Sequence, residues 1–140
     1  MENNRTFALI KPCAVKNNHY GEIIHLIIKA GFTLKAVKMI KLSIEEARQF
    51  YAMHTGKEFF DRLTSFISSG PLVALVLEKE NAVEEYRKLI GATDPAKAEQ
   101  GTIRQRFGES LTKNAVHGAD SPENAQKEWS FFFPQMEILD

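Results

Sequence analysis

The sequence has few of the features that mark secreted or membrane proteins. It holds a single cysteine, Cys13, so no disulfide can form within the chain. No apolar run approaches the roughly 20 residues that cross a bilayer, since even the isoleucine-rich segment 23–28 contains His25. The N-terminal residues also lack the basic start and apolar stretch of a secretory signal. We therefore expect a cytoplasmic protein.

Net charge is also absent. Eighteen Lys and Arg residues balance eighteen Asp and Glu residues, so no global field draws the chain to nucleic acid or to an anionic membrane. The glycine-rich phosphate loops, of the Walker type or of the form Gly-x-Gly-x-x-Gly, are missing as well. A phosphate site would therefore be built from a local cluster of side chains and single helix termini.

The residues that are present suffice for one domain. The chain has 140 residues, 44% of them hydrophobic, which is enough for one packed core and too little for two ordinary domains. No repeat, linker or low-complexity segment divides it. We expect residues 1–140 to form a single domain.

Apolar periodicity predicts an alternation of strands and helices. Short apolar runs indicate strands, and apolar residues at helical spacing after a capping residue indicate helices. The predicted strands are 7–10, 33–42 and 72–77, and helices are predicted at about 20–30, around 63–67, and after the caps Ser43, Asn81 and Ser121. With a late short strand, this order predicts an α+β fold, a ferredoxin-like antiparallel four-stranded sheet with helices on one face.

Three cations are candidates for holding phosphate. Lys11 follows the first predicted strand, Arg87 lies beside the apolar stripe of a predicted helix, and Arg104 falls in the polar, irregular segment 91–118. Arginine offers a planar fork of donors that fits phosphate oxygens, and lysine supplies a compact charge. Taken singly, each of these side chains is better explained as solvated surface.

His117 has the most suggestive surroundings of the four histidines. Asn114, Gly118, Asp120 and Ser121 place hydrogen-bonding groups and a flexible glycine around it. A neutral imidazole is a competent nucleophile if an acceptor fixes its other nitrogen, and Glu128 could supply that acceptor. From the residues alone, a capping or surface role remains the alternative, and the other histidines lack a comparable setting.

The aromatic residues leave two interpretations open. Tyr51 falls on the same helix face as Ala47 and could face either a core or a cleft. Phe59 and Phe60 fit a core, although a half-exposed phenylalanine could instead stack on a nucleotide base.

Together these segments resemble the nucleoside diphosphate kinase family, and the resemblance runs nearly end to end. Residues 114–121, Asn-Ala-Val-His-Gly-Ala-Asp-Ser, resemble the family's active-site motif, whose histidine is phosphorylated. Residues 6–12 look like the family's first strand, 59–60 with 69–71 like its middle segment, and 101–104 like its phosphate-gripping segment.

The resemblance implies a role for each matching residue. It makes His117 the nucleophile, Glu128 the partner of the other imidazole nitrogen, and Tyr51 a neighbour of the histidine. It implies that Phe59 stacks on the base and that the phosphates and sugar are held by Lys11, Arg87, Thr93, Arg104 and Asn114. The implied activity is ping-pong transfer of the γ-phosphoryl group from a nucleoside triphosphate to a nucleoside diphosphate, with broad base and sugar tolerance.

The family also implies partners and cofactors. It implies ATP and other nucleotides as substrates, Mg²⁺ carried in by the nucleotide without a dedicated protein metal site, and a homo-oligomer, a tetramer or alternatively a hexamer, built from dimers. Two other functions fit the residues less well. One is a ferredoxin-like module that binds nucleotide without turnover, and the other is nucleic-acid binding, which zero net charge opposes.

Several positions depart from the family pattern. Ala119 stands where serine is usual, and we expect the missing hydroxyl to leave Glu128 less firmly oriented and catalysis slower. Cys13 replaces the common aspartate or asparagine, Lys57-Glu58 the common Arg-Pro, and Gln105-Arg106 the common Gly-Asp. None of these departures falls on a residue assigned to direct nucleotide contact.

Overall fold

Two apolar runs form the centre of a four-stranded sheet. The computed structural model describes residues 3–140, and its strands are β1 (Arg5–Ile10), β2 (Thr33–Ile40), β3 (Leu72–Glu78) and β4 (Val116–Gly118). They are ordered β2-β3-β1-β4, and each neighbouring pair is antiparallel. β1 and β3 are inner strands and are buried nearly throughout. The predicted antiparallel α+β sheet is confirmed.

Of the three predicted capping residues, Ser43 and Ser121 cap helices through their side chains. The helices are α1 (Pro12–Lys16), α2 (Tyr20–Lys29), α3 (Ile44–Phe50), α4 (Phe60–Ile67), α5 (Ala82–Ile90), α6 (Ile103–Phe107) and α7 (Pro122–Phe132), with short 3-10 turns at η1 (Ala52–His54), η2 (Pro95–Lys97) and η3 (Gln135–Glu137). Ser43 and Glu46 form a reciprocal capping box at α3. Ser121 accepts the Asn124 amide at α7.

The predicted cap at Asn81 is wrong. Asn81 adopts a left-handed conformation, with φ of 55°, and its side chain does not cap α5. Instead the Asn3 backbone carbonyl accepts the Ala82 amide at 2.8 Å, and the Asn3 side-chain oxygen accepts the Val83 amide at 3.3 Å. A residue near the start of the chain thus does what a local cap would have done.

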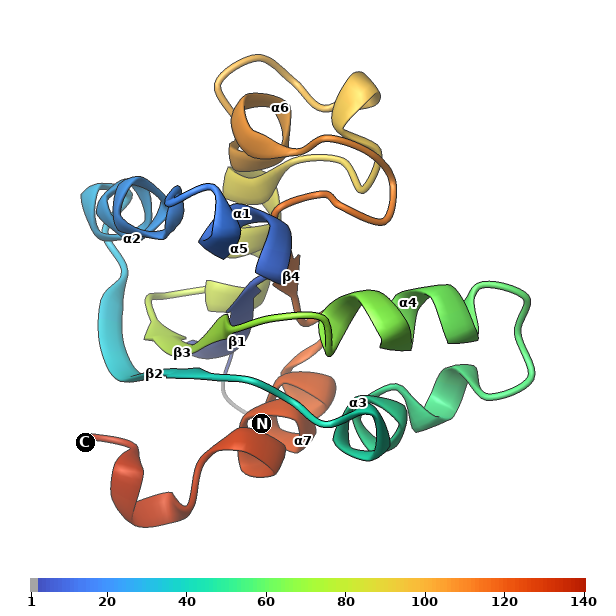
Figure 1. Ribbon diagram of the computed structural model, residues 1–140. Helices are drawn as coiled ribbons and strands as arrows, with labels where there is room; N and C mark the ends of the chain where they lie inside the picture. The colour runs from blue at the N-terminus through green and yellow to red at the C-terminus, as the bar shows by residue number, and fades with distance from the viewer. Residues whose placement is uncertain (1–2) are drawn as a thin grey trace.

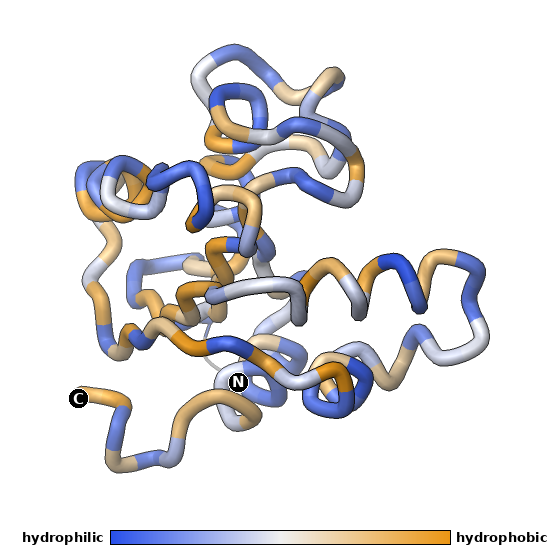
Figure 2. Tube along the Cα trace, in the orientation of Figure 1, coloured by the Kyte–Doolittle hydropathy of each residue, from blue (hydrophilic) through white to orange (hydrophobic). Residues whose placement is uncertain are grey.

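Helices cover both faces of the sheet, whereas the sequence led us to expect them on one. Ala8 and Ile10 of β1 pack with apolar residues of α2 and α5, while Phe7 and Leu9 face residues of α3, α4 and α7 on the opposite side. Figure 1 shows α2 and α3 on opposite sides of the strands, and Figure 2 shows apolar segments gathered along them. Because both faces are buried, β1 reads as a continuous apolar run without alternation.

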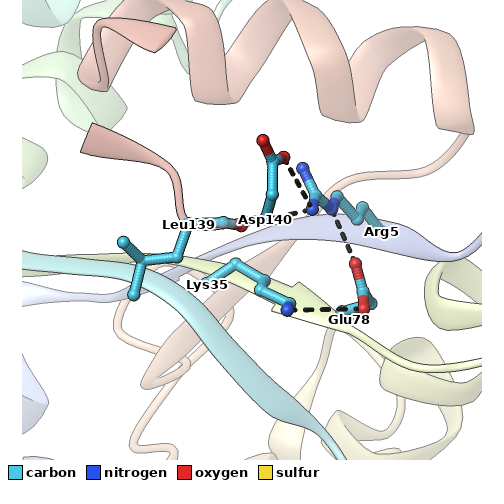
Figure 3. A network of polar contacts seen from close by, with 5 residues as sticks. All are labelled: Arg5, Lys35, Glu78, Leu139 and Asp140. Carbon is cyan, nitrogen blue, oxygen red and sulfur yellow. Dashed lines mark hydrogen bonds and ion pairs between the residues drawn. The ribbon is translucent and has the colours of Figure 1, made fainter. Parts of the chain in front are cut away.

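Arg5 of β1 contacts both the neighbouring strand β3 and the last residues of the chain. Arg5 Nε donates to Glu78 at 2.8 Å, and Arg5 Nη2 donates to the Leu139 carbonyl at 3.3 Å. Lys35 lies 3.6 Å from Glu78, and its carbonyl accepts the Leu139 amide at 2.8 Å (Figure 3). None of the helices within residues 3–140 is long and apolar enough to span a membrane.

Candidate active site

His117 lies on the short edge strand β4, opposite Leu9 of β1. Its side chain is about one-fifth exposed, and its Nε2 lies 2.9 Å from Oε1 of Glu128, which comes from α7. A carboxylate can only accept, so in the neutral ring Nε2 carries the proton and Nδ1 carries the free lone pair. This pair thus fixes which nitrogen of His117 is available as a nucleophile.

A cavity of about 420 Å³ opens in front of His117. Tyr51, Arg87 and Glu128 line it together with the histidine, and Asp120 and Lys127 lie on its wall. Tyr51 is buried, and this burial, aided by the charge of Glu128, raises the pKa of its phenol above the ordinary value. The Tyr51 hydroxyl therefore stays protonated and can donate to an anion in the cavity.

A second cavity, of about 450 Å³, adjoins the first through Arg87, which lines both. Thr93, Lys97, Thr102 and Arg104 also line it. Arg87 thus places one cation on the walls of both the cavity in front of His117 and the second cavity.

Arg104 is buried and is held by backbone carbonyls. Its Nη1 donates to the Gly91 carbonyl and its Nη2 to the Val116 carbonyl, both at 3.0 Å. Its Nε has no hydrogen-bond partner among the described residues. Burial is the main reason that the pKa of Arg104 lies below its ordinary value, but a guanidinium stays charged in proteins. Arg104 is thus a fixed cation directly beside the strand that carries His117.

Lys11 and Asn114 lie next to the start of β4. The Lys11 backbone amide donates to the Ala115 carbonyl at 2.8 Å, and burial, followed by the charge of Arg104, lowers the pKa of the Lys11 ammonium to about 8. Asn114 Nδ2 donates to the Thr93 carbonyl at 3.0 Å, which joins the segment at 93 to the start of β4. Asn114 Oδ1 is buried without a partner in residues 3–140.

A tight turn at Ala115 connects Asn114 to β4. Ala115 has φ of 76°, and the Val116 amide donates to the Asn114 carbonyl at 3.0 Å. This is a γ-turn, a conformation that costs free energy in any residue other than glycine. The turn lies two residues before His117, where backbone strain often marks a functional segment.

Phe59 is half-buried at the start of α4. Its ring centroid lies 5.3 Å from that of His54, and the Lys57 ammonium lies 5.9 Å from it. His54 in turn lies 6.2 Å from the Tyr51 ring. The half-exposed face of Phe59 remains available for stacking, so the prediction of base stacking stays open.

The structure brings most of the predicted site residues together. His117, Glu128, Tyr51 and Arg87 line one cavity, and Arg87, Thr93 and Arg104 line the adjoining one. Lys11 and Asn114 line neither cavity, but the Lys11 amide donates to the Ala115 carbonyl and Asn114 Nδ2 donates to the carbonyl of Thr93, which lines the second cavity. Phe59 is linked to Tyr51 through His54.

Two residues of the site were missed at the level of sequence. His54 lines the cavity, and its Nδ1 is buried with no hydrogen-bond partner in the described part of the chain. Phe50 lines the same cavity, with its ring 5.9 Å from the His117 imidazole. Phe50 directly precedes Tyr51 and His54 follows it by three residues, which was the available indication, but proximity to His117 depends on tertiary contacts.

The departures from the family pattern lie in different parts of the fold. Ala119 is buried in the apolar cluster below His117, and its amide donates to the Phe7 carbonyl at 3.2 Å. Gln105 Oε1 accepts the Gly101 amide, and Arg106 lies 3.5 Å from Glu22. Cys13 is buried as a free thiol, and burial raises its pKa. A looser Glu128 as a result of Ala119 stays a prediction.

Metal-ligating side chains are sparse near the cavity. Within residues 3–140, no three His, Cys, Asp or Glu side chains gather closely enough to hold a metal ion. Asp120 is the cavity carboxylate not engaged with His117, and its Oδ1 already accepts from Asn124 Nδ2 at 2.6 Å. This donor set suits a cation held mainly by phosphate oxygens, which is how Mg²⁺ usually binds beside nucleotides.

Comparison with known proteins finds the same family along the whole chain. Residues 4–138 match the family model described as nucleoside diphosphate kinase. The chain is 54% identical to a nucleoside diphosphate kinase of Salinibacter ruber, covering 99% of this chain and 98% of that one. It is 49% identical to one of Flavobacterium psychrophilum, over 95% and 96% of the two chains.

Solved structures agree with the sequence relatives. The fold superposes on the Aquifex aeolicus nucleoside diphosphate kinase with a TM-score of 0.95 at 42% identity, over 97% of this chain and 99% of that one. It superposes on a halophilic nucleoside diphosphate kinase of Halobacterium salinarum in complex with CDP with a TM-score of 0.94 at 37% identity, over 99% and 93%. Given these matches, the chain belongs to the nucleoside diphosphate kinase family and is a phosphotransferase that acts on nucleotides.

Proposed function

We propose that this enzyme transfers the γ-phosphoryl group between nucleotides in a ping-pong cycle through His117. The Nδ1 lone pair attacks the γ-phosphorus, the bond to the β-phosphate oxygen breaks, and the nucleoside diphosphate leaves with those electrons. A second diphosphate then attacks the phosphohistidine and regenerates the neutral ring. The 2.9 Å contact between Nε2 and Glu128 carries the proposal, because it directs Nδ1 to the reaction and stabilises the positive charge that develops on the ring.

The cations around the cavity are suited to the charge of the transferred group. We assign Arg87 and Arg104 to the phosphate oxygens, with Lys11 as a third cation and with Thr93 and Asn114 as neutral hydrogen-bonding partners for the phosphates and sugar. Arg87 lines both cavities, and Arg104, which is held by backbone carbonyls, lines the second one, so positive charge borders both cavities. Such preorganised charge accounts for most of the catalysis in phosphoryl transfer.

Tyr51, His54 and Asp120 complete the proposed site. Tyr51 stays protonated and can donate to the transferred phosphoryl group. His54 also lines the cavity, with its ring beside those of Tyr51 and Phe59. Asp120 is the cavity carboxylate best placed to contact a Mg²⁺ ion carried by the nucleotide. When bound, the ion offsets phosphate charge.

We assign the base to Phe59. A phenyl ring contacts the flat face of a base and leaves its hydrogen-bonding edge unread, so purines and pyrimidines should be accepted alike. Phe59 is half-buried next to Lys57 and to His54, which lines the first cavity, and this position supports the assignment. We expect ribose and deoxyribose substrates both to react.

Labelling with γ-³²P-ATP tests the phosphohistidine directly. We expect acid-labile label on the wild-type chain and no label on His117→Ala, with full labelling of His25→Ala, because His25 is exposed on α2. The labelled enzyme should pass its phosphate to added CDP or GDP. Label that persists in His117→Ala would rule out this nucleophile, and binding without any exchange would indicate a non-catalytic nucleotide-binding module.

We propose that residues 1–140 act as one cytoplasmic domain that assembles into a homo-oligomer, a tetramer or alternatively a hexamer. β2 is an edge strand of the sheet, and its Val37 and Met39 side chains are each about half exposed. An edge strand with exposed apolar residues favours pairing with another chain. Light scattering on the purified enzyme would give the subunit number, and a monomer would contradict the proposal.

A further inference from the structure

Phe50 is the aromatic residue on which three parts of the active site converge. It ends α3, directly before Tyr51, and its ring centroid lies 4.9 Å from the Tyr51 ring. It lies 5.9 Å from the His117 imidazole at an interplanar angle of 76°. On its other sides it contacts Phe131 at 5.5 Å and Phe132 at 5.2 Å, both on the helix that carries Glu128.

A second ring borders the same imidazole. Phe7 of β1 is fully buried and lies 6.3 Å from His117 at 61°. Phe7 also lies 6.1 Å from Phe50, so the two phenyl rings contact each other as well as the histidine. The imidazole of His117 is thus bordered by two fixed rings that meet it edge to face, a favourable arrangement for aromatic pairs.

The hydrogen bond to Glu128 alone does not fix the imidazole plane. The torsion between Cβ and Cγ of histidine is broad, because it joins an sp³ atom to an sp² atom. Glu128 is itself about one-fifth exposed and sits on a flexible side chain. A ring that turned about this torsion would lose its Nε2 contact and direct Nδ1 away from the cavity. Packing against neighbouring rings is what narrows this rotation.

We propose that Phe50 is a positioning residue that restricts the rotation of the His117 imidazole, keeping Nε2 on Glu128 and Nδ1 directed into the cavity. Its kinetic consequence rests on the proposed phosphohistidine mechanism. Phe50 acts through His117, and the phosphates and base are assigned to other side chains. Losing the ring should therefore slow phosphoryl transfer to His117 and leave the affinity for nucleotide unchanged.

Phe50→Met tests this proposal, since methionine keeps much of the apolar volume without a flat ring. Phe50→Tyr should retain the wild-type tautomer and phosphorylation rate of His117, because it keeps the aromatic ring. Phe66→Met is the matched control, since Phe66 is a half-buried phenylalanine that lines a separate cavity with Pro12 and Glu109. Phe50→Leu would replace Phe50→Met if the latter did not fold.

The first measurement is the ¹⁵N chemical shifts of the His117 ring, which need no turnover. We expect one fixed tautomer with the proton on Nε2 in wild type, Phe50→Tyr and Phe66→Met, and averaged shifts in Phe50→Met. An unchanged tautomer in Phe50→Met would overturn the proposal, because Glu128 would then suffice. This result would stand even if His117 were never phosphorylated.

The second measurement is rapid-quench labelling with γ-³²P-ATP over a range of concentrations. We expect the maximal rate of His117 phosphorylation to fall roughly ten- to hundredfold in Phe50→Met, as small misplacements of reacting groups do, with the half-saturating ATP concentration unchanged. A loss of affinity with an unchanged maximal rate would overturn the positioning role. Absence of label in wild type would instead refute the proposed function.

Discussion

Lys11 is a buried cation whose charge depends on pH near neutrality. Burial, with the charge of Arg104 as the second cause, holds the pKa of Lys11 at about 8, well below the ordinary 10.5. Bound phosphates would oppose this shift and favour the charged form. We therefore predict that nucleotide affinity falls as pH rises through about 8, measured as the dissociation constant of ADP by calorimetry at pH 7 and 9.5.

Stability should change in the opposite direction over the same range. Between pH 8 and 10.5 the unfolded chain keeps the Lys11 proton that the folded, nucleotide-free protein has released. More protons on the unfolded state mean that the free energy of unfolding rises with pH. Lys11→Met should remove this contribution from both urea unfolding and ADP binding. If both pH dependences survive in Lys11→Met, another group causes them.

At the scale of elements, the segment between α5 and β4 depends on the glycine at its first bend. Gly91 has φ of 85°, and a Cβ there would lie 2.5 Å from Thr102 Oγ1. The Gly91 carbonyl also accepts from Arg104 Nη1. Thr102 caps α6, the helix that carries Arg104. A side chain at position 91 would thus displace the helix that carries Arg104, the cation that we assign to the phosphates.

We predict that Gly91→Ala lowers both stability and nucleotide affinity. Gly56→Ala is the matched control, because Gly56 has nearly the same φ of 86° but a Cβ added there would meet no atom within 4 Å. Both variants should lose stability from the positive φ, and Gly91→Ala should lose more, because the ψ of −175° at Gly91 lies in a region that essentially only glycine adopts and because its Cβ would meet Thr102. Only Gly91→Ala should bind ADP more weakly. Urea unfolding and calorimetry measure the two effects, and equal losses in both variants would mean that the collision with Thr102 is relieved without cost.

Elements with local determinants were predictable from the sequence. Ser43 with Glu46, and Ser121 with Pro122, set helix starts through neighbours three residues away or fewer. The apolar run at 72–77 gave an inner strand because burial on both faces leaves no polar alternation. The predicted cap at Asn81 was wrong because Asn3 caps the helix instead, and Asn3 is too far away in the sequence to be recognised from neighbouring residues.

The residues of the candidate site also fall into those that the sequence could identify and those that depend on tertiary contacts. A family motif could name His117, Arg104 and Asn114, but the pairing of the two strands β1 and β4 is what sets Lys11 beside Ala115. Phe50 and His54 escaped prediction because an aromatic or a histidine on a helix face is usually core or surface. Their relevance follows from which other elements the fold packs against α3 and η1.

At the scale of the whole molecule, the contacts of Arg5 hold the C-terminal residues against the sheet at a distance from the candidate active site. Arg5 joins Glu78 of β3 to the Leu139 carbonyl, so it holds the C-terminal residues against the strands (Figure 3). The length of β1 separates Arg5 from Lys11. Stability and catalysis should therefore be separable at this position.

We predict that Arg5→Gln lowers the free energy of unfolding by about 1 kcal/mol, the upper range for a partly exposed ion pair, and leaves the rate of phosphoryl exchange unchanged. Arg48→Gln, on the exposed side of α3, removes the same charge and should lose less stability. Urea unfolding and a steady-state exchange assay on both variants measure the difference. A fall in exchange that matched the loss of stability would mean that the chain ends are coupled to His117 through β1.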